Sequence, residues 1–464
     1  MNHKTKHDLV ILNLISDFEE SISTGRGMFL SEKSYFEIIE YYHKDNQLKK
    51  ALSVTDMAIK QFNFQVEYYL RKANILKRLN RPQECLAVLD KAEEIAPFEL
   101  DVKLMKIKVF AYSGNITGAQ QILAEVKSYM TDSEATEVLL SESYIHEVTQ
   151  EYDQMYSVLK KAISNDPHND ESLDRFWIAI EFSKNYYNAI QFLLSIIDRT
   201  PYSYLAWYNL GEAYSCVGEY SKAIDALEYS FIIKPDFQVA YYECADICIQ
   251  EKNHKKALEI YKEALVQFGA DEEVLLNMAE CQKELGNLSA AKYNLYKALK
   301  FDPYNDEVYF KLGSCYAIER NWNNAIKAFH KAISIEENTE DYYLGLAESY
   351  YSLGSFEKAD FFYRKATTIA PEDSSYWSKY ATFLIKTGER SLALQLLRKA
   401  EDFTFGADLL YCQATASILE KNEKGYLIME EALQEDFSLH PMIFQIEPEL
   451  ALDKKIIAMI NYFR

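Results

Sequence analysis

The 464-residue sequence contains no hydrophobic run long enough to cross a bilayer. Its apolar runs, such as the one from Leu9 to Leu12, fall far short of the ~20 residues that a membrane span needs. The apolar stretch near the N-terminus is interrupted by Asn13 and followed by Asp17 and Glu19, and no small-residue cleavage site follows it. We therefore expect neither a membrane span nor a secretion signal.

Cysteine is scarce, with seven residues in the chain, and the odd count does not suit a disulfide framework. This usage favours a reducing compartment, and we predict a cytoplasmic location. Cys244 and Cys248 lie one helical turn apart and could form half of a metal site. Both occupy apolar positions and no histidine shares their segment, so we predict no metal site.

The common motifs of catalysis are also missing. The sequence has no glycine-rich phosphate loop, no GxSxG, no HExxH and no CxxC, and its eight histidines are scattered. We predict that the protein is not an enzyme and needs no cofactor. The rival reading, an enzyme with a separate catalytic part, has little room, because the pattern described next fills residues 32–439.

The main positive signal is a proline that returns every 34 residues. A fixed period of this length is typical of a stacked repeat array rather than a globular domain. At two of the marks another residue stands in place of proline. The marks are Pro167, Pro201, Pro235, Gly269, Pro303, Glu337 and Pro371.

Other residue types recur with the same period. The clearest copy has Trp207, Leu210, Gly211, Tyr214, Ala223, Leu227, Ser230 and Pro235. This pattern resembles the tetratricopeptide repeat family, whose repeats place residues of these types at positions 4, 7, 8, 11, 20, 24, 27 and 32. The resemblance implies an all-α fold, a right-handed superhelix (α-solenoid) of about 12 stacked helix-turn-helix repeats. We place the repeats at 32–65, 66–99, 100–133, 136–169, 170–203, 204–237, 238–271, 272–305, 306–339, 340–373, 374–407 and, in degraded form, 408–439.

The period also predicts the domain organisation. We expect an N-terminal helical segment at 1–31 with a helix from His7 to Ile22, repeats 1–3 at 32–133, repeats 4–12 at 136–439 and a capping helix within 440–464, all in one continuous superhelix. We predict the capping helix because apolar residues recur at helical spacing, namely Leu452, Ile456, Ile457, Ile460 and Phe463. Two extra residues at 131–135 form a seam, either a bend or sequence drift. Lys72 and Lys106 depart from the apolar character of position 7.

Small residues at fixed positions predict close helix contacts. Glycine inside a helix costs roughly 0.5–1 kcal/mol relative to alanine, so Gly211 and Gly313 at position 8 indicate a neighbour too near for a Cβ atom. Position 20 is alanine in nine of eleven copies. We expect these residues to lie where the two helices of a pair meet.

The net charge of −21 disfavours nucleic acid and anionic membrane as partners. The family resemblance implies that positions 2, 5, 9 and 12 of each first helix line a concave groove. Position 9 is a carboxylate in four of repeats 6–10, with Ser314 in repeat 9, position 2 adds Glu273, Glu307 and Asp341, and aromatic residues stand at position 5 in several repeats. We predict a ribbon of mutually repelling acids that binds a basic, partly apolar peptide; the alternative is a merely solvated face. The candidate residues are Glu212, Asp246, Glu280, Glu307, Glu348, Tyr208, Tyr242 and Phe310.

We expect a non-catalytic scaffold or adaptor that binds a protein or peptide partner. Family members that capture acidic C-terminal peptides use Lys, Asn and Arg at the groove positions, and here only Asn74 and Lys108 resemble that set. The alternative is a structural subunit that self-associates in a larger assembly. The sequence leaves the partner and the oligomeric state open.

Overall fold

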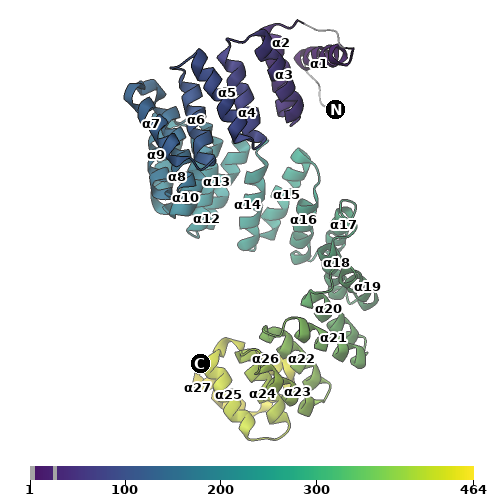
Figure 1. The fold of residues 1–464 in the computed structure, drawn as a ribbon. Helices are drawn as coiled ribbons and strands as arrows, with labels where there is room; N and C mark the ends of the chain where they lie inside the picture. The colour runs from purple at the N-terminus through teal and green to yellow at the C-terminus, as the bar shows by residue number, and fades with distance from the viewer. Residues whose placement is uncertain (1–5, 25–28, 464) are drawn as a thin grey trace. The chain divides into compact units, whose positions relative to one another are not determined.

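The computed structural model describes residues 6–24 and 29–463. These residues form 27 α-helices and three short 3-10 helices, and no strand occurs among them (Figure 1). The predicted all-α fold is confirmed. Residues 1–5 and 25–28 of the predicted segment 1–31, and Arg464 of the predicted capping helix, lie outside the described residues.

The chain forms two compact units, 1–247 and 248–464, with the boundary inside helix α14. In the first unit, helices follow one another in pairs. They are α1 (Lys6–Thr24), α2 (Glu32–Lys44), α3 (Leu48–Gln61), α4 (Val66–Arg78), α5 (Pro82–Ile95), α6 (Leu100–Tyr112), α7 (Ile116–Tyr129), η1 (Asp132–Glu134), α8 (Ala135–Val148), α9 (Tyr152–Asn165), α10 (Asp170–Ser183), α11 (Tyr186–Arg199), α12 (Tyr204–Cys216), α13 (Tyr220–Ile233) and α14 (Gln238–Gln250).

The second unit continues the same alternation of first and second helices and ends in shorter elements. They are α15 (His254–Phe268), α16 (Glu272–Glu284), α17 (Leu288–Ala298), α18 (Asp306–Ile318), α19 (Trp322–Ile333), α20 (Glu340–Ser352), α21 (Phe356–Ile369), α22 (Ser374–Lys386), α23 (Arg390–Ala400), α24 (Ala407–Leu419), α25 (Lys424–Glu435), η2 (Phe437–Leu439), α26 (Pro441–Ile446), η3 (Pro448–Leu452) and α27 (Lys454–Phe463).

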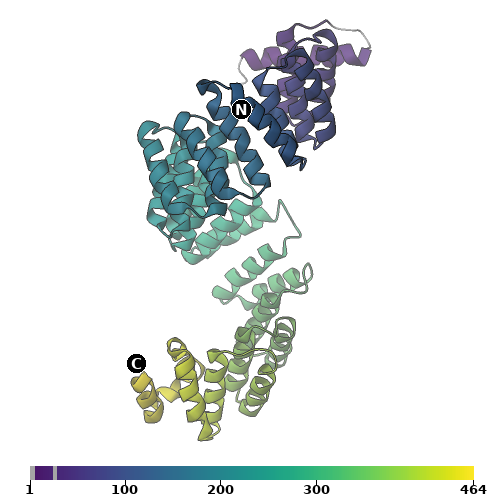
Figure 2. The same ribbon diagram turned by 60° about the vertical axis from the view of Figure 1, so that its left-hand side comes forward.

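The helix bounds follow the predicted repeats closely. With the exception of two repeats that start one residue away, each first helix begins at the first residue of its predicted repeat. Within each unit, consecutive pairs lie side by side, as in a solenoid (Figure 2). The predicted N-terminal helix is also confirmed, because α1 covers 6–24 and buries Ile15 and Phe18 against α2.

The large residue at position 4 and the proline at position 32 are connected by a hydrogen bond. Trp207 Nε1 donates to the backbone carbonyl of Pro201 over 2.9 Å, and Trp377 Nε1 donates to that of Pro371 over 2.9 Å. Where Glu337 replaces the proline, Tyr343 still donates its hydroxyl to the carbonyl, over 3.0 Å. In these repeats the bond ties the first helix to the preceding turn and needs no proline ring, so Glu337 can replace proline at this mark.

The predicted close contacts at small residues are confirmed. A Cβ atom built on Gly211 would lie 2.6 Å from Leu227 Cγ, and one built on Gly313 would lie 2.5 Å from the Phe329 ring. The nine alanines at position 20 are fully buried. In both cases the neighbour of the glycine is a side chain at position 24, on the second helix of the same pair. The residue at position 8 must therefore be small to leave room for that side chain.

Position 15 adopts left-handed backbone geometry in repeats 1–11, and Lys421, at position 14 of the degraded repeat 12, does the same. Its φ values are positive at glycine and non-glycine residues alike, from 54° to 90° across the set. The residues are Asn46, Asn80, Gly114, Gln150, Lys184, Gly218, Lys252, Gly286, Arg320, Gly354, Gly388 and Lys421. The turn between the two helices therefore has one fixed conformation that glycine suits best.

Charged residues at position 7 of repeats 2 and 3 are accommodated by ion pairs. Lys106 is 5% exposed and contacts Asp90 at 2.6 Å and also Glu93 on α5. Lys72 contacts Asp56 at 2.5 Å. Burying an ammonium group is tolerated only when a carboxylate accompanies it, so the repeat keeps its geometry without the usual apolar residue.

The seam and the C-terminal end depart from the regular repeat. At the seam, the 3-10 helix η1 occupies Asp132–Glu134, and the backbone N–H of Thr131 donates to the Glu134 carboxylate over 2.7 Å. At the C-terminal end, the expected single helix is divided into η3 and α27. The prediction was wrong for Leu452, which is 84% exposed because η3 breaks the helical spacing, while Ile456 is buried as expected.

Candidate functional site

The first helices α10, α12 and α14 of the first unit carry a group of carboxylates that we call the acidic surface. It consists of Asp174, Glu181, Glu212 and Glu243, next to the phenol of Tyr208. Among the described residues, these four carboxylates form no ion pair. A cluster of carboxylates without counter-cations attracts an external cation more strongly than carboxylates that are already paired.

Glu212 is the most perturbed member of the acidic surface. One of its carboxylate oxygens, Oε1, is buried and has no hydrogen-bond partner among the described residues. Burial, together with the charges of Glu243 and Glu181, raises the pKa of Glu212 to about 8. Burial and Asp246 also raise the pKa of Glu243. Glu212 is therefore largely protonated at neutral pH and would ionise beside a cation.

Aromatic side chains adjoin the acidic surface. Tyr208 makes an edge-to-face contact with Phe237, with ring centroids 5.2 Å apart. Burial and the nearby carboxylates, Glu212 first, raise the pKa of its hydroxyl, so the phenol stays neutral. Tyr242 accepts a hydrogen bond from Gln238 Nε2 over 2.6 Å. The structure thus brings Tyr208 and Glu212 together, as the shared helix predicted, with Tyr242 and the half-buried Asp246 on α14.

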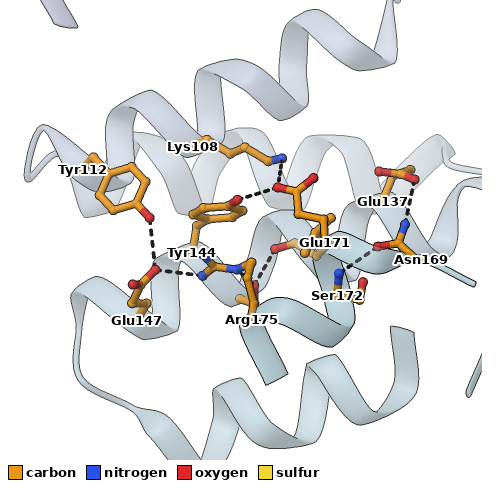
Figure 3. Close-up of polar contacts among 11 residues, drawn as sticks. Lys108, Tyr112, Glu137, Tyr144, Glu147, Asn169, Glu171, Ser172 and Arg175 are labelled. Atoms are coloured by element: carbon orange, nitrogen blue, oxygen red, sulfur yellow. Dashed lines mark hydrogen bonds and ion pairs between the residues drawn. The ribbon is translucent and has the colours of Figure 1, made fainter. Parts of the chain in front are cut away.

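A separate polar network connects α6, α8 and α10 earlier in the first unit. Lys108 Nζ contacts Glu171 Oε1 at 3.0 Å, and the hydroxyl of Tyr144 donates to Glu171 over 2.5 Å (Figure 3). The guanidinium of Arg175, 5% exposed as a residue, lies 3.4 Å from the centroid of the Tyr144 ring. Figure 3 shows Tyr144 between Lys108 and Arg175.

The cations of this network have internal partners. Arg175 donates to Glu147 Oε2 over 2.8 Å and to Ser143 Oγ over 3.0 Å. Burial opposes ionisation of Glu171, but Lys108 and Tyr144 outweigh it and lower its pKa. Because Lys108 is already paired, it is not an open receptor for an acidic peptide. The network instead holds three first helices together beside the acidic surface.

The four predicted residues of the second unit have a different environment. Glu280 contacts both Lys283 on its own helix and, at 3.3 Å, Lys311 on α18. Lys311 also contacts Glu307 at 3.3 Å. The predicted ribbon of unrelieved acids was therefore wrong for Glu280 and Glu307, because lysines from the same and adjacent first helices neutralise them. Burial acts to raise the pKa of Glu280, but the interactions with Lys283 and Lys311 outweigh burial and lower this pKa.

Glu348 and Phe310 line a pocket in the second unit. Glu348 Oε1 lies 3.9 Å from Lys379 Nζ. Phe310 packs against Phe329 and Tyr342, with ring centroids 5.8 Å and 5.2 Å apart. The pocket has a volume of about 880 Å³ and is mostly apolar in lining. It is therefore a different kind of surface from the acidic surface of the first unit.

Sequence reasoning missed three members of the acidic surface. Asp174 and Glu181 stand at positions 5 and 12 of repeat 5, so extending the groove positions by one repeat would have found them. Glu243 stands at position 6, where the family pattern gave no reason to look. The pairs Glu280–Lys283 and Glu307–Lys311 lie three and four residues apart on one helix, so helical spacing would have found them, whereas the contact of Lys311 with Glu280 joins adjacent repeats and has no such signal.

The described residues offer neither a metal site nor a membrane-spanning helix. No group of three or more His, Cys, Asp or Glu side chains is placed to hold a metal ion in the described part of the chain. Within the same residues, no helix has the length and apolar character that a bilayer crossing requires.

Models of the tetratricopeptide repeat match five segments of the chain, at residues 66–99, 206–228, 249–292, 306–339 and 340–373. Four of the five matches start within two residues of a repeat boundary given above. These five segments of the chain are tetratricopeptide repeats. No curated protein sequence matches it significantly.

Several solved structures are similar in fold. A tetratricopeptide repeat protein from Parabacteroides merdae is 18% identical, with a TM-score of 0.43, over 53% of this chain and 97% of that one. The protein YrrB, described as having an unusual peptide-binding site, is 18% identical, with a TM-score of 0.34, over 40% of this chain and 95% of its own. A chain of the Cut9–Hcn1 complex is 15% identical, with a TM-score of 0.37, over 88% of this chain and 94% of that one.

Proposed function

We propose that this protein is a non-catalytic interaction scaffold, and that the acidic surface of its first unit binds a basic segment of a partner protein. Stacked repeats present an extended, preformed surface, so little ordering cost falls on the receptor. The observation that supports a basic partner is Glu212, a buried carboxylate with an unpartnered oxygen among further carboxylates that have no counter-cation. A lysine or arginine would supply the missing charge.

The aromatic neighbours favour a partner segment that is partly apolar. Tyr208 offers a ring face to an arginine or to an apolar side chain, and such contacts add stacking to the ion pair. In the second unit the predicted acids already have lysine partners, so we confine the basic-segment proposal to the first unit. A cytoplasmic location remains a proposal from the sequence.

Affinity capture with mass spectrometry tests this proposal. The double variant Glu212→Gln/Glu243→Gln removes two charges from the acidic surface and should lose the basic partners that the wild-type protein retains. Asp198→Asn/Asp225→Asn removes two charges from exposed sites on α11 and α13 and should retain them. Equal capture by both variants would refute the proposal. An oligomer in light scattering that persists without partners would favour the self-associating subunit instead.

A further inference from the structure

The pocket of the second unit that Glu348 and Phe310 line lies along the first helices α18, α20 and α22, and we call it the apolar groove. Its lining includes Phe310, Ile318, Trp322, Leu344, Tyr351 and Phe383. Ile318 is 58% exposed, which is unusual for a large aliphatic side chain surrounded by other apolar residues. Pockets of this size and composition commonly receive apolar side chains of a ligand.

The chain itself occupies one end of the apolar groove. The short helix α26 packs against α22 and α24, and its residues Met442, Gln445 and Ile446 form a wall of the groove. Ile446 belongs to the same buried cluster as Leu344 and Phe383. Met442 and Ile446 stand four residues apart, so one face of a helix supplies both contacts. The first helices therefore already hold one short apolar helix against them.

The charges along the apolar groove differ from those of the acidic surface. Lys386 is exposed and forms no ion pair within the described residues. Lys379 is 3.9 Å from Glu348, at the outer limit of an ion pair, and its side chain is 49% exposed. Lys379 follows Ser378 and Lys386 lies three residues after Phe383 on α22, so the α22 side of the groove is apolar and cationic, while Asp341 and Glu348 line the α20 side.

We propose that the apolar groove binds an amphipathic segment of a partner protein, which lies alongside α26, fills the groove with apolar side chains and places carboxylates at Lys379 and Lys386. The occupant has the opposite charge from the partner of the acidic surface. The protein would thus hold two different segments, one on each unit. This mode of recognition, a helix laid in a groove, uses apolar anchors one turn apart.

Fluorescence anisotropy with two labelled peptides tests this inference on the full chain. Both probes carry methionine and isoleucine four residues apart, as in α26, with glutamate at the remaining exposed positions of one probe and lysine at those of the other. The Glu212→Gln/Glu243→Gln protein, whose acidic surface no longer attracts the lysine probe, should bind the glutamate probe more tightly. Adding Lys379→Glu/Lys386→Glu should weaken binding of the glutamate probe by on the order of tenfold or more and should strengthen binding of the lysine probe.

Ile318→Asp tests the apolar part and should also weaken the glutamate probe. The matched controls, Lys365→Glu and Val266→Asp, change exposed residues outside the groove and should leave binding unchanged. Equal binding of both probes, no binding of the glutamate probe, or no effect of the groove variants would overturn the inference. So would a wild-type dimer that Ile318→Asp dissociates, since the groove would then be covered by a second copy. Every protein in this assay carries Glu212→Gln/Glu243→Gln, because the acidic surface is itself proposed to bind a basic, partly apolar peptide such as the lysine probe; this inference and the proposed function therefore fail separately.

Discussion

At the scale of single residues, position 9 of the repeat shows how much one side chain depends on its neighbours. Glu212 and Glu280 occupy the same position in repeats 6 and 8. Lys283 and Lys311 hold the pKa of Glu280 down, whereas burial and like charges raise that of Glu212 to about 8. The same repeat position is thus a structural ion pair in one unit and an unpaired carboxyl in the other.

Glu212→Gln should change how stability depends on pH. Because the folded-state pKa lies above the unfolded value of 4.5, the folded protein retains a proton between the two values and loses stability as pH rises from about 4.5 to about 8. The variant lacks this loss. At pH 9 it should be more stable than the wild-type protein by on the order of 1–4 kcal/mol in urea unfolding, with little difference at pH 4.

The matched control for this experiment is Asp198→Asn, an exposed carboxylate on α11. It should follow the wild-type pH profile. If the Glu212 variant follows that profile as well, the carboxyl is not held in its protonated form and the account of the acidic surface loses its central residue.

At the scale of helices and turns, the sequence predicted most of what the structure contains. The period alone located the helix pairs, because positions 8 and 20 are fixed by packing inside the repeat and position 4 by a hydrogen bond to the preceding turn. Leu452 was misplaced, since apolar spacing does not distinguish an α-helix from a 3-10 turn followed by a helix. The partners that Glu280 and Glu307 have on their own helices, Lys283 and Lys311, follow from helical spacing and were overlooked, whereas the contact of Lys311 with Glu280 joins two repeats and was not predictable from spacing.

Ala332→Leu tests the packing between the helices of a pair. Ala332 is fully buried at position 27, so added methyl groups must displace neighbours and should cost about 1–3 kcal/mol. Lys327→Ala on the same helix is exposed and should change stability by less than about 0.5 kcal/mol. Urea unfolding of both variants measures the difference. Similar losses would mean that the helix face is assigned incorrectly.

Arg320→Gly tests the left-handed turn. Arg320 has φ 58° and an exposed position between α18 and α19, so glycine removes strain that its Cβ creates. The variant should gain about 0.5–1.5 kcal/mol in thermal or urea unfolding. The reverse change, Gly354→Ala at the equivalent turn, should lose a similar amount. A loss of stability in Arg320→Gly would show that flexibility of the unfolded chain outweighs the turn geometry.

At the scale of the whole molecule, the net charge of −21 conceals an uneven distribution. The acidic surface of the first unit has no cation among the described residues, while the second unit surrounds Glu280 and Glu307 with lysines and leaves Lys386 unpaired. The composition predicted an acidic protein. Which carboxylates have a lysine partner is visible only in the structure, and this pairing distinguishes a surface that can accept a basic segment from one that is already neutralised.

The most direct test of the central claim is a set of synthetic peptides graded in net charge, with aromatic and apolar residues held constant. Binding to a protein whose acidic surface is intact, and whose apolar groove is disabled by the uncharged changes Lys379→Gln/Lys386→Gln/Ile318→Ser, is measured against salt and pH. The account predicts that affinity rises with positive charge, falls with salt, and strengthens as pH rises through about 8, where Glu212 ionises. Glu212→Gln/Glu243→Gln should abolish this dependence. Charge-dependent binding that survives that double substitution unchanged would contradict it.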